Sequence, residues 1–236
     1  MKMSTIEHIK VISFDGDMTL WDFNRVMRNS LSVALREIQR RVTNPASTDL
    51  TIDTMIEIRN SVAAELKGKI TNLEEIRFHA FCRTLEQVGV NDNDLATELN
   101  TLYLKHRFED VELYPDVIPC LETLRENYTI GLLSNGNSYP ERCGLSGYFN
   151  FAIFSQDVGV DKPDARMFNE ACKEAGCATS ELMHVGDSQR NDVAGANGVG
   201  AVSVWLNRSG RRNGSGIEAN FEIKSLIEIA KIVNIP

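Results

Sequence analysis

Short apolar segments alternate with amphipathic segments along most of the chain. The first apolar run is Ile9–Phe14, which ends abruptly at Asp15. Nearly continuous apolar runs of this length are typical of strands that are covered on both faces of a parallel sheet. We predict further strands at Thr129–Leu133, Phe149–Phe154, Leu182–Val185 and Ala201–Leu206, with a weak one near Phe221–Ile223.

Helical patterns separate these apolar runs in the second half of the chain. They cover Val117–Glu126, Ala165–Gly176 and Asn191–Asn197, and a last helix is expected from Ser225 to Val233. Strands that alternate with helices indicate βαβ units and therefore a parallel sheet with helices on its faces. The pattern predicts an α/β core.

The segment 21–111 differs, because it has helical periodicity and no convincing strand. Apolar residues recur at spacings of three and four in three stretches, 23–42, 73–88 and 95–102. This spacing predicts a bundle of about four amphipathic helices. We therefore expect two domains: a core formed by residues 1–20 and 112–236, and a helical domain, 21–111, inserted after the first strand.

Composition and charge narrow the classes of function. The 236 residues carry a net charge of −8, and 42% of them are hydrophobic. Such a chain can bury a real core and is neither low-complexity nor wholly disordered. The acidic balance argues against a nucleic-acid polymer as partner, because phosphate backbones favour basic surfaces. A small anion is still an acceptable ligand, since a site can be locally positive in an acidic protein.

The residues also suggest a compartment. The first ten residues lack the apolar run of a signal peptide, and no stretch is long enough for a membrane helix. Five cysteines without a CxxC pair argue against both a disulfide framework and a zinc site. We expect a cytoplasmic protein with reduced thiols and no membrane partner; the oligomeric state is left open.

Polar residues follow the predicted strands at one edge of the sheet, where ligands bind in open parallel sheets. Several carboxylates that converge on one edge repel each other unless a cation lies between them. Oxygen ligands favour Mg²⁺, and no His or Cys is placed to suggest zinc. A nearby hydroxyl, backbone N–H groups and a lysine suit a phosphoryl group, and a carboxylate can act as its nucleophile. The candidate residues are Asp15, Asp17, Ser134, Asn135, Lys162, Asp187 and Asp192.

These residues, in this order, resemble the four motifs of the haloacid dehalogenase-like (HAD) superfamily. Asp15-Gly16-Asp17-Met18-Thr19 is similar to the first motif, Ser134 to the second and Lys162 to the third. Gly186-Asp187 with Asn191-Asp192 is similar to the fourth. The resemblance covers essentially the whole chain and implies a Rossmann-like α/β core. The helical insertion then looks like a C1-type cap of subfamily I, which would cover the site and choose the substrate.

The resemblance implies a role for each matching position. Asp15 would be the nucleophile, and Asp17 would be the acid that protonates the leaving oxygen and then the base that activates water. Mg²⁺ would be bound by the carboxylates of Asp15 and Asp187 and by the backbone carbonyl of Asp17. Lys162 would neutralise the charge shared by the nucleophile and the phosphate. Two supporting roles are implied as well: phosphate binding by Ser134 and the backbone at Asn135, and support of the metal shell or Lys162 by Asp192.

The same resemblance distinguishes the phosphatases of the superfamily from the dehalogenases that give it its name. Dehalogenases of the superfamily lack the second acid of the first motif, whereas this chain has Asp17. The expected function is therefore a Mg²⁺-dependent phosphatase for a small phosphorylated metabolite, such as a nucleotide, flavin mononucleotide, phosphoglycolate or a sugar phosphate. The departure at Met18, where many relatives have Gly, is expected to alter the turn after the strand and not to abolish activity.

Several alternatives remain at this point. A phosphomutase uses the same residues, and a haloacid dehalogenase shares the fold. A signalling receiver module or a non-catalytic protein that binds a phosphorylated ligand would also gather carboxylates at such an edge. Two residues near the motifs, Trp21 and His184, are interpreted as ordinary packing and as a structural histidine.

Overall fold

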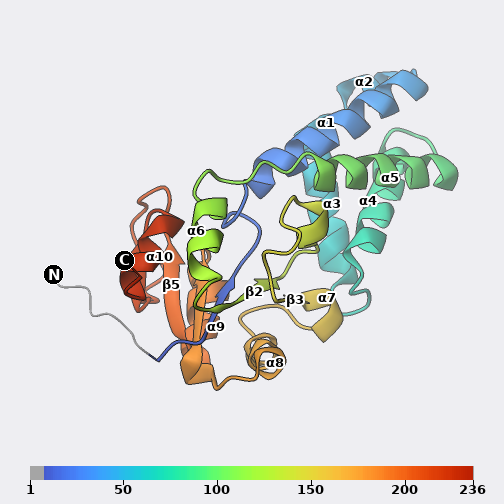
Figure 1. Cartoon of the computed structure of the whole chain (residues 1–236). Coiled ribbons are helices and arrows are strands. Elements are labelled where there is room, and N and C mark those ends of the chain that lie inside the picture. The colour runs from blue at the N-terminus through green and yellow to red at the C-terminus, as the bar shows by residue number, and fades with distance from the viewer. Residues whose placement is uncertain (1–7, 236) are drawn as a thin grey trace. The chain divides into compact units, whose positions relative to one another are not determined.

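The computed structural model describes residues 8–235, and their chain divides into two compact units (Figure 1). One unit contains the chain up to Asp22 and again from Glu112 onward. The other contains Phe23–Val111 and consists of helices. We call them the α/β unit and the helical unit.

A six-stranded parallel sheet forms the centre of the α/β unit, which confirms the predicted α/β fold. The strand order is β3-β2-β1-β4-β5-β6, so the first strand lies in the middle with a neighbour on each side. All four residues of the first strand are buried, as its unbroken apolar run predicts. The strands are β1 (Val11–Phe14), β2 (Thr129–Ser134), β3 (Phe151–Phe154), β4 (Leu182–Gly186), β5 (Val202–Leu206) and β6 (Phe221–Ile223).

The register of the central strands decides where the polar residues lie. Phe14 at the end of β1 is paired with Leu132 of β2 and with Val185 of β4. The next backbone N–H, that of Asp15, donates to the carbonyl of Val185 at 2.9 Å. Because parallel strands all end at the same edge, the segments that follow β1, β2 and β4 meet there.

Helices of the α/β unit pack around this sheet. A buried apolar cluster joins Val11 and Leu133 of the sheet to Phe168 and Ala196 of two helices. After β4 the chain forms one π-helical turn, Gln189–Val193, where we had predicted an α-helix from Asn191. The α-helices of this unit are α6 (Val117–Leu124), α7 (Ser155–Val158), α8 (Ala165–Ala175), α9 (Ala194–Gly198) and α10 (Ile229–Ile232).

The helical unit contains five helices in the described chain, where the periodicity predicts about four. The extra one is α2, which has only five residues and is therefore too short to produce a periodic pattern. Side-chain caps fix several helix starts; Asp92, for example, accepts a hydrogen bond from the N–H of Leu95 at 2.9 Å. The helices are α1 (Phe23–Arg41), α2 (Pro45–Asp49), α3 (Ile52–Leu66), α4 (Leu73–Gln87) and α5 (Asn93–Glu109).

No helix of residues 8–235 is long and apolar enough to span a lipid bilayer.

The packing at Gly131 of β2 leaves no room for a larger side chain, which can be tested. A Cβ atom there would lie 2.2 Å from the Phe151 ring of the neighbouring strand. We expect Gly131→Ala to lower the free energy of unfolding by about 1–3 kcal/mol, the usual cost of overpacking. Gly198→Ala is the matched control, because nothing lies within 4 Å of its Cβ position. Urea unfolding curves that show equal stability for both variants would contradict this packing.

Candidate active site

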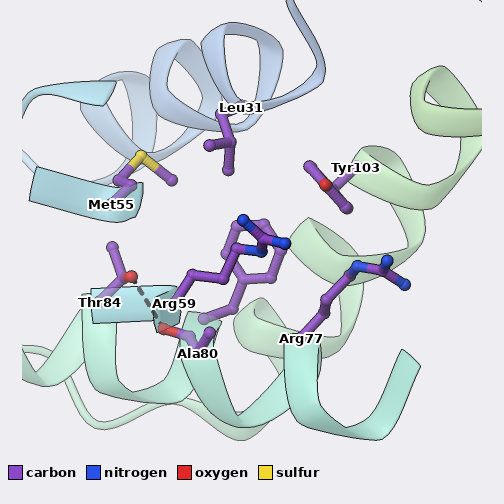
Figure 2. Close-up of a pocket in the computed structure, with 8 residues that line it drawn as sticks. Leu31, Met55, Arg59, Arg77, Ala80, Thr84 and Tyr103 are labelled. Carbon is purple, nitrogen blue, oxygen red and sulfur yellow. Dashed lines mark hydrogen bonds between the residues drawn. The ribbon is translucent and has the colours of Figure 1, made fainter. Parts of the chain in front are cut away.

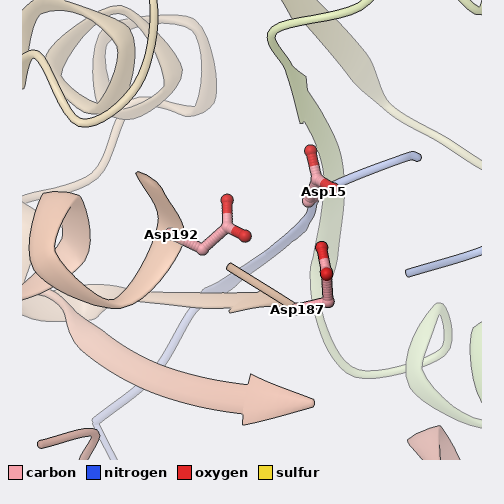
Figure 3. A group of neighbouring side chains, drawn as sticks. All are labelled: Asp15, Asp187 and Asp192. Carbon is pink, nitrogen blue, oxygen red and sulfur yellow. The ribbon is translucent and has the colours of Figure 1, made fainter. Parts of the chain in front are cut away.

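Three carboxylates converge at the edge of the sheet. Asp15 follows β1, Asp187 follows β4, and Asp192 belongs to the π-helical turn (Figure 3). One oxygen from each lies within 4.8 Å of the other two. These are three of the residues that the sequence places at this edge. Grouped carboxylate oxygens are the ligand type that hard divalent cations such as Mg²⁺ prefer, so the donor set fits the expected metal.

Lys162 lies at the centre of this cluster and is almost fully buried. Its ammonium group is 2.8 Å from Asp15 Oδ1 and 2.7 Å from Asp192 Oδ1. It also donates to the backbone carbonyl of Leu133 at 2.6 Å. Burial by itself lowers the pKa of this lysine, but the two carboxylates outweigh burial and raise it. The side chain is therefore a fixed positive charge between Asp15 and Asp192.

The carboxylates respond to the same environment in opposite ways. Burial and repulsion from Asp192 and Asp187 raise the pKa of Asp15, although Lys162 opposes the shift. Burial, followed by repulsion from Asp192, raises the pKa of Asp187 to about 6. Burial also acts to raise the pKa of Asp192, but Lys162 and His184 outweigh it and the pKa falls. Two of the three groups therefore lack enough positive charge nearby, which a bound cation would supply.

Asp17 lies two residues beyond Asp15, in a tight turn. Its Oδ1 accepts a hydrogen bond from the Trp21 indole N–H at 2.8 Å and another from the Ser138 hydroxyl at 3.4 Å. The buried indole occupies space that Gly16 leaves open, since a Cβ on Gly16 would lie 3.0 Å from the Trp21 ring. The sequence suggested only packing for Trp21, because the hydrogen bond depends on how this turn folds.

Met18 occupies the turn in a conformation that favours glycine, with a φ of 66°. Its N–H donates to the Trp21 carbonyl at 2.8 Å, and the N–H of Leu20 donates to the Gly16 carbonyl at 2.8 Å. The turn thus closes with methionine in place, at a cost of roughly 1 kcal/mol in backbone strain.

The second and third motifs are tied together through Asn135. Its side-chain amide donates to the Lys162 carbonyl at 3.0 Å and accepts from the Lys162 N–H at 2.7 Å. Beside it, the buried hydroxyl of Ser134 accepts a hydrogen bond from the Gly136 N–H at 3.0 Å. The Asn135 side chain therefore positions the lysine loop, a role that the sequence did not reveal.

Behind the cluster, His184 of β4 joins two buried side chains. Its Nε2 is 3.2 Å from Asp192 Oδ1, and its Nδ1 is 2.8 Å from the Ser13 hydroxyl. Burial, and to a lesser degree Lys162, lower the pKa of this histidine, which is therefore neutral and has one N–H. Because a carboxylate only accepts, that hydrogen must be on Nε2, and the Ser13 hydroxyl then donates to Nδ1.

Asp192 is consequently held by donors on three sides. They are the His184 ring, the Lys162 ammonium and the Ser188 N–H, which lies 2.9 Å from Oδ2. Its carboxylate fits against the strand only because residue 186 is glycine, where a Cβ would lie 2.2 Å from the Asp192 carboxyl carbon. The glycine of the fourth motif thus makes room for the aspartate that pairs with the lysine.

Comparison with known proteins identifies the family to which this site belongs. A family model described as haloacid dehalogenase-like hydrolase matches residues 9–200. The chain therefore belongs to the haloacid dehalogenase-like hydrolases, as its motifs predicted.

Two curated relatives illustrate the activities found in this family. A glyceraldehyde 3-phosphate phosphatase of Methanopyrus kandleri is 27% identical over 207 residues, which cover 85% of this chain and 84% of the relative. The pyrimidine 5'-nucleotidase YjjG of Escherichia coli is 30% identical over 172 residues, which cover 70% and 74% of the two chains.

Among solved structures, a 2-haloacid dehalogenase from Pseudomonas syringae superposes with a TM-score of 0.81 and 31% identity. The match covers 96% of this chain and 98% of that one. A magnesium-bound HAD hydrolase, YfnB from Bacillus subtilis, superposes with a TM-score of 0.72 at 23% identity, which establishes likeness of fold. Proteins with this fold therefore catalyse more than one reaction, so the reaction has to be inferred from the residues of the site.

The raised pKa of Asp187 predicts a pH-dependent stability. In chelator, the Asp187 carboxyl binds its proton more tightly in the folded protein than in the unfolded chain, where its pKa has the ordinary value of 3.8. Stability from this group is therefore lost as the pH rises from about 4 to about 6. At pH 8, Asp187→Asn should be more stable than the wild type by up to about 3 kcal/mol, or about 6–12 °C in Tm.

Thermal unfolding at pH 5 and pH 8 measures this effect. The advantage of Asp187→Asn should shrink at pH 5, and Mg²⁺ at pH 8 should raise the Tm of the wild type more than that of the variant. Glu174→Gln, an exposed acid on α8, controls for the loss of one negative charge. An advantage of Asp187→Asn that is the same at both pH values would contradict the assigned repulsion.

A pair of substitutions tests the hydrogen bond from His184 to Asp192. Glutamine can donate from a position close to Nε2, whereas asparagine reaches only as far as Nδ1. We expect His184→Gln to keep the turnover of an aryl phosphate within about threefold and His184→Asn to lower kcat at least tenfold, a usual effect of losing a buried orienting contact. Equal kcat in two variants of equal Tm would contradict this positioning role.

Proposed function

We propose that the protein is a Mg²⁺-dependent phosphatase that hydrolyses a small phosphorylated metabolite through an aspartyl-phosphate on Asp15. Family membership and the phosphatase relatives make the chain a phosphoric monoester hydrolase. The observation that carries the proposal is the pairing of Asp15 with the buried ammonium group of Lys162 at the end of β1. The second acid, Asp17, follows two residues later.

The first step makes one bond and breaks one. A carboxylate oxygen of Asp15 attacks phosphorus, and the bond between phosphorus and the ester oxygen breaks. The departing oxygen takes the proton of Asp17, so the leaving group is released as a neutral alcohol. Lys162 stays charged throughout and offsets negative charge on the nucleophile and on the phosphoryl oxygens.

The second step returns the enzyme to its starting state. The ionised Asp17 takes a proton from water, and the resulting hydroxide attacks the phosphorus of the acyl phosphate. The bond from phosphorus to Asp15 breaks, which releases inorganic phosphate and leaves Asp17 protonated for the next cycle. The indole of Trp21 and the hydroxyl of Ser138 hold the Asp17 carboxylate in one orientation during both proton transfers.

The donor set fits Mg²⁺. The carboxylates of Asp15 and Asp187 and the backbone carbonyl of Asp17 would hold the ion, with Asp192 supporting the arrangement through Lys162. When bound, the ion supplies positive charge that offsets the anionic phosphoryl group among these carboxylates. Phosphate oxygens are expected at the Ser134 hydroxyl and at the backbone N–H groups that follow it.

The substrate class follows from the relatives only at a coarse level. Their names cover a sugar phosphate, a nucleotide and, for a relative from Thermus thermophilus that is 31% identical over 65% of this chain, phosphoserine. We propose a small phosphorylated metabolite of this kind, with the helical unit acting as the cap that selects it. Nucleotides, flavin mononucleotide, phosphoglycolate and sugar phosphates are the candidates to compare by kcat/KM.

The likeness to a 2-haloacid dehalogenase supports a second candidate reaction. Hydrolysis of a carbon–halogen bond needs a carboxylate nucleophile but no acid to protonate the leaving halide. A second acid held by an indole and a hydroxyl, as Asp17 is, suits an alkoxide leaving group better. Chloride release from 2-chloropropionate at a rate above that of phosphate release would favour the dehalogenase.

Removal of the nucleophile tests the proposal. Wild-type protein should release phosphate from an aryl phosphate with Mg²⁺, and the release should stop in chelator. We expect Asp15→Asn to lower kcat at least a thousandfold, because the amide of asparagine cannot replace the carboxylate that forms the intermediate. Asp157→Asn, an exposed acid on α7, should keep wild-type activity. Full activity of Asp15→Asn would contradict the nucleophile assignment.

A further inference from the structure

A small space lies between four helices of the helical unit. Figure 2 shows side chains of α1, α3, α4 and α5 around it, among them Leu31, Met55 and Tyr103. It has room for about one water molecule, so it offers no site for an organic ligand. The contacts at the end of β5, in the α/β unit, bear more directly on function.

Trp205 of β5 lies beside the fourth motif. The register pairs it with Gly186 of β4, the residue just before Asp187. Its side chain is buried, and the indole N–H donates to the backbone carbonyl of Asp187 at 2.9 Å. The end of β5, where the sequence predicted no functional residue, therefore contacts a member of the carboxylate cluster.

Arg211 reaches the same carbonyl oxygen from the loop that follows β5. Its Nη2 donates to the Asp187 carbonyl at 2.8 Å and lies 3.8 Å from Asp187 Oδ2. The guanidinium group lies over the Trp205 ring, 5.9 Å from its centroid. Since 3.8 Å is too long for a hydrogen bond, the arginine binds the main chain of Asp187 rather than its carboxylate.

A buried asparagine fixes the backbone of Arg211, whose own side chain is more than half exposed. The Asn207 side chain accepts from the Arg211 N–H at 3.0 Å and donates to the Arg211 carbonyl at 2.8 Å. The loop between them closes through a hydrogen bond from the Gly210 N–H to the Asn207 carbonyl at 3.0 Å. The guanidinium group thus extends from an ordered main chain, which lowers the entropy cost of holding it at Asp187.

The peptide group between Asp187 and Ser188 is consequently held at both ends. Its carbonyl accepts from Trp205 and Arg211, and its N–H donates to Asp192 Oδ2 at 2.9 Å. Because a peptide group is planar, these three hydrogen bonds fix its plane and with it the ψ angle of Asp187. They therefore also fix the direction in which the Asp187 side chain leaves the main chain toward the cluster.

We propose that Trp205 and Arg211 are positioning residues for metal binding, which hold the Asp187 carboxylate where it can coordinate Mg²⁺. The inference rests on the proposed function, because it takes Asp187 as a metal ligand. Both side chains act through the main chain, and neither is assigned a bond to the ion. A ligand that is already oriented loses less conformational entropy when the ion binds, so loss of either contact should weaken Mg²⁺ binding.

Calorimetric titration of the metal-free protein with Mg²⁺ measures this effect. Trp205→Phe removes the N–H donor without a change of charge, and we expect Kd to rise about tenfold, the lower end for outer contacts of metal ligands. Arg211→Lys keeps the positive charge but not the planar fork, and it should raise Kd about threefold. Because neither variant alters the net charge, a rise in Kd reports the lost contact and not a changed electrostatic field.

Ser203→Ala is the matched control, because it also removes a buried hydrogen bond from β5. The Ser203 hydroxyl donates to Asn197 Oδ1 at 2.7 Å and not to a residue of the site. This variant should lose thermal stability and bind Mg²⁺ as the wild type does. Thermal unfolding in chelator shows whether each variant is folded, and Arg211→Lys, at an exposed side chain, keeps the test valid if Trp205→Phe is not.

Two results would overturn the inference and leave the proposed metal site standing: an unchanged Kd in both Trp205→Phe and Arg211→Lys, or an equal rise in Ser203→Ala. Absence of Mg²⁺ binding by the wild type would instead refute the metal site of the proposed function, and the inference with it.

A kinetic measurement separates positioning from general damage to the site. In phosphate release from an aryl phosphate, Trp205→Phe should raise the Mg²⁺ concentration for half-maximal rate about tenfold. At saturating Mg²⁺ its kcat should stay within about twofold of the wild type. A fall in kcat that excess Mg²⁺ does not restore would contradict a role in metal binding.

Discussion

One ammonium group holds the site together. Lys162 Nζ lies within 3 Å of carboxylate oxygens of both Asp15 and Asp192, with almost no exposure to solvent. Three charges can be buried together only if each is paired and hydrogen-bonded, because an isolated buried charge costs several kcal/mol. The surrounding contacts meet this condition. Asn135 fixes the backbone of Lys162, and His184 holds Asp192 in place to receive it.

This arrangement still leaves the cluster short of positive charge. Lys162 pairs with Asp15 and Asp192, and among the described residues Asp187 has only the more distant Arg211, at 3.8 Å. Burial and the repulsion between carboxylates therefore leave the pKa values of Asp15 and Asp187 raised. In the proposed function this electrostatic strain is useful, because the site would bind a cation before it binds a phosphate anion. A bound cation would reverse the local excess of negative charge, and a protein with a net charge of −8 could then receive an anion at this site.

Much of the fold follows from the sequence, and so does the list of residues that meet at the sheet edge. Unbroken apolar runs marked the strands, and the abrupt change to Asp15 after Phe14 marked the edge. The supporting contacts could not be predicted in this way. The bonds from Trp21 to Asp17 and from His184 to Asp192 depend on the fold of one turn and on side chains that cross between neighbouring segments. Periodicity carries no information about either.

The central claim is that Asp15 carries the phosphoryl group during turnover. Borohydride reduces an acyl phosphate to an alcohol and leaves a free carboxylate unchanged, so it converts a phosphorylated aspartate to homoserine. Quenching the protein with borohydride during turnover of an aryl phosphate, followed by mass spectrometry of its peptides, locates the intermediate. The account predicts homoserine at position 15 and aspartate at position 17. Homoserine at position 17, or at neither position during steady turnover, would contradict it.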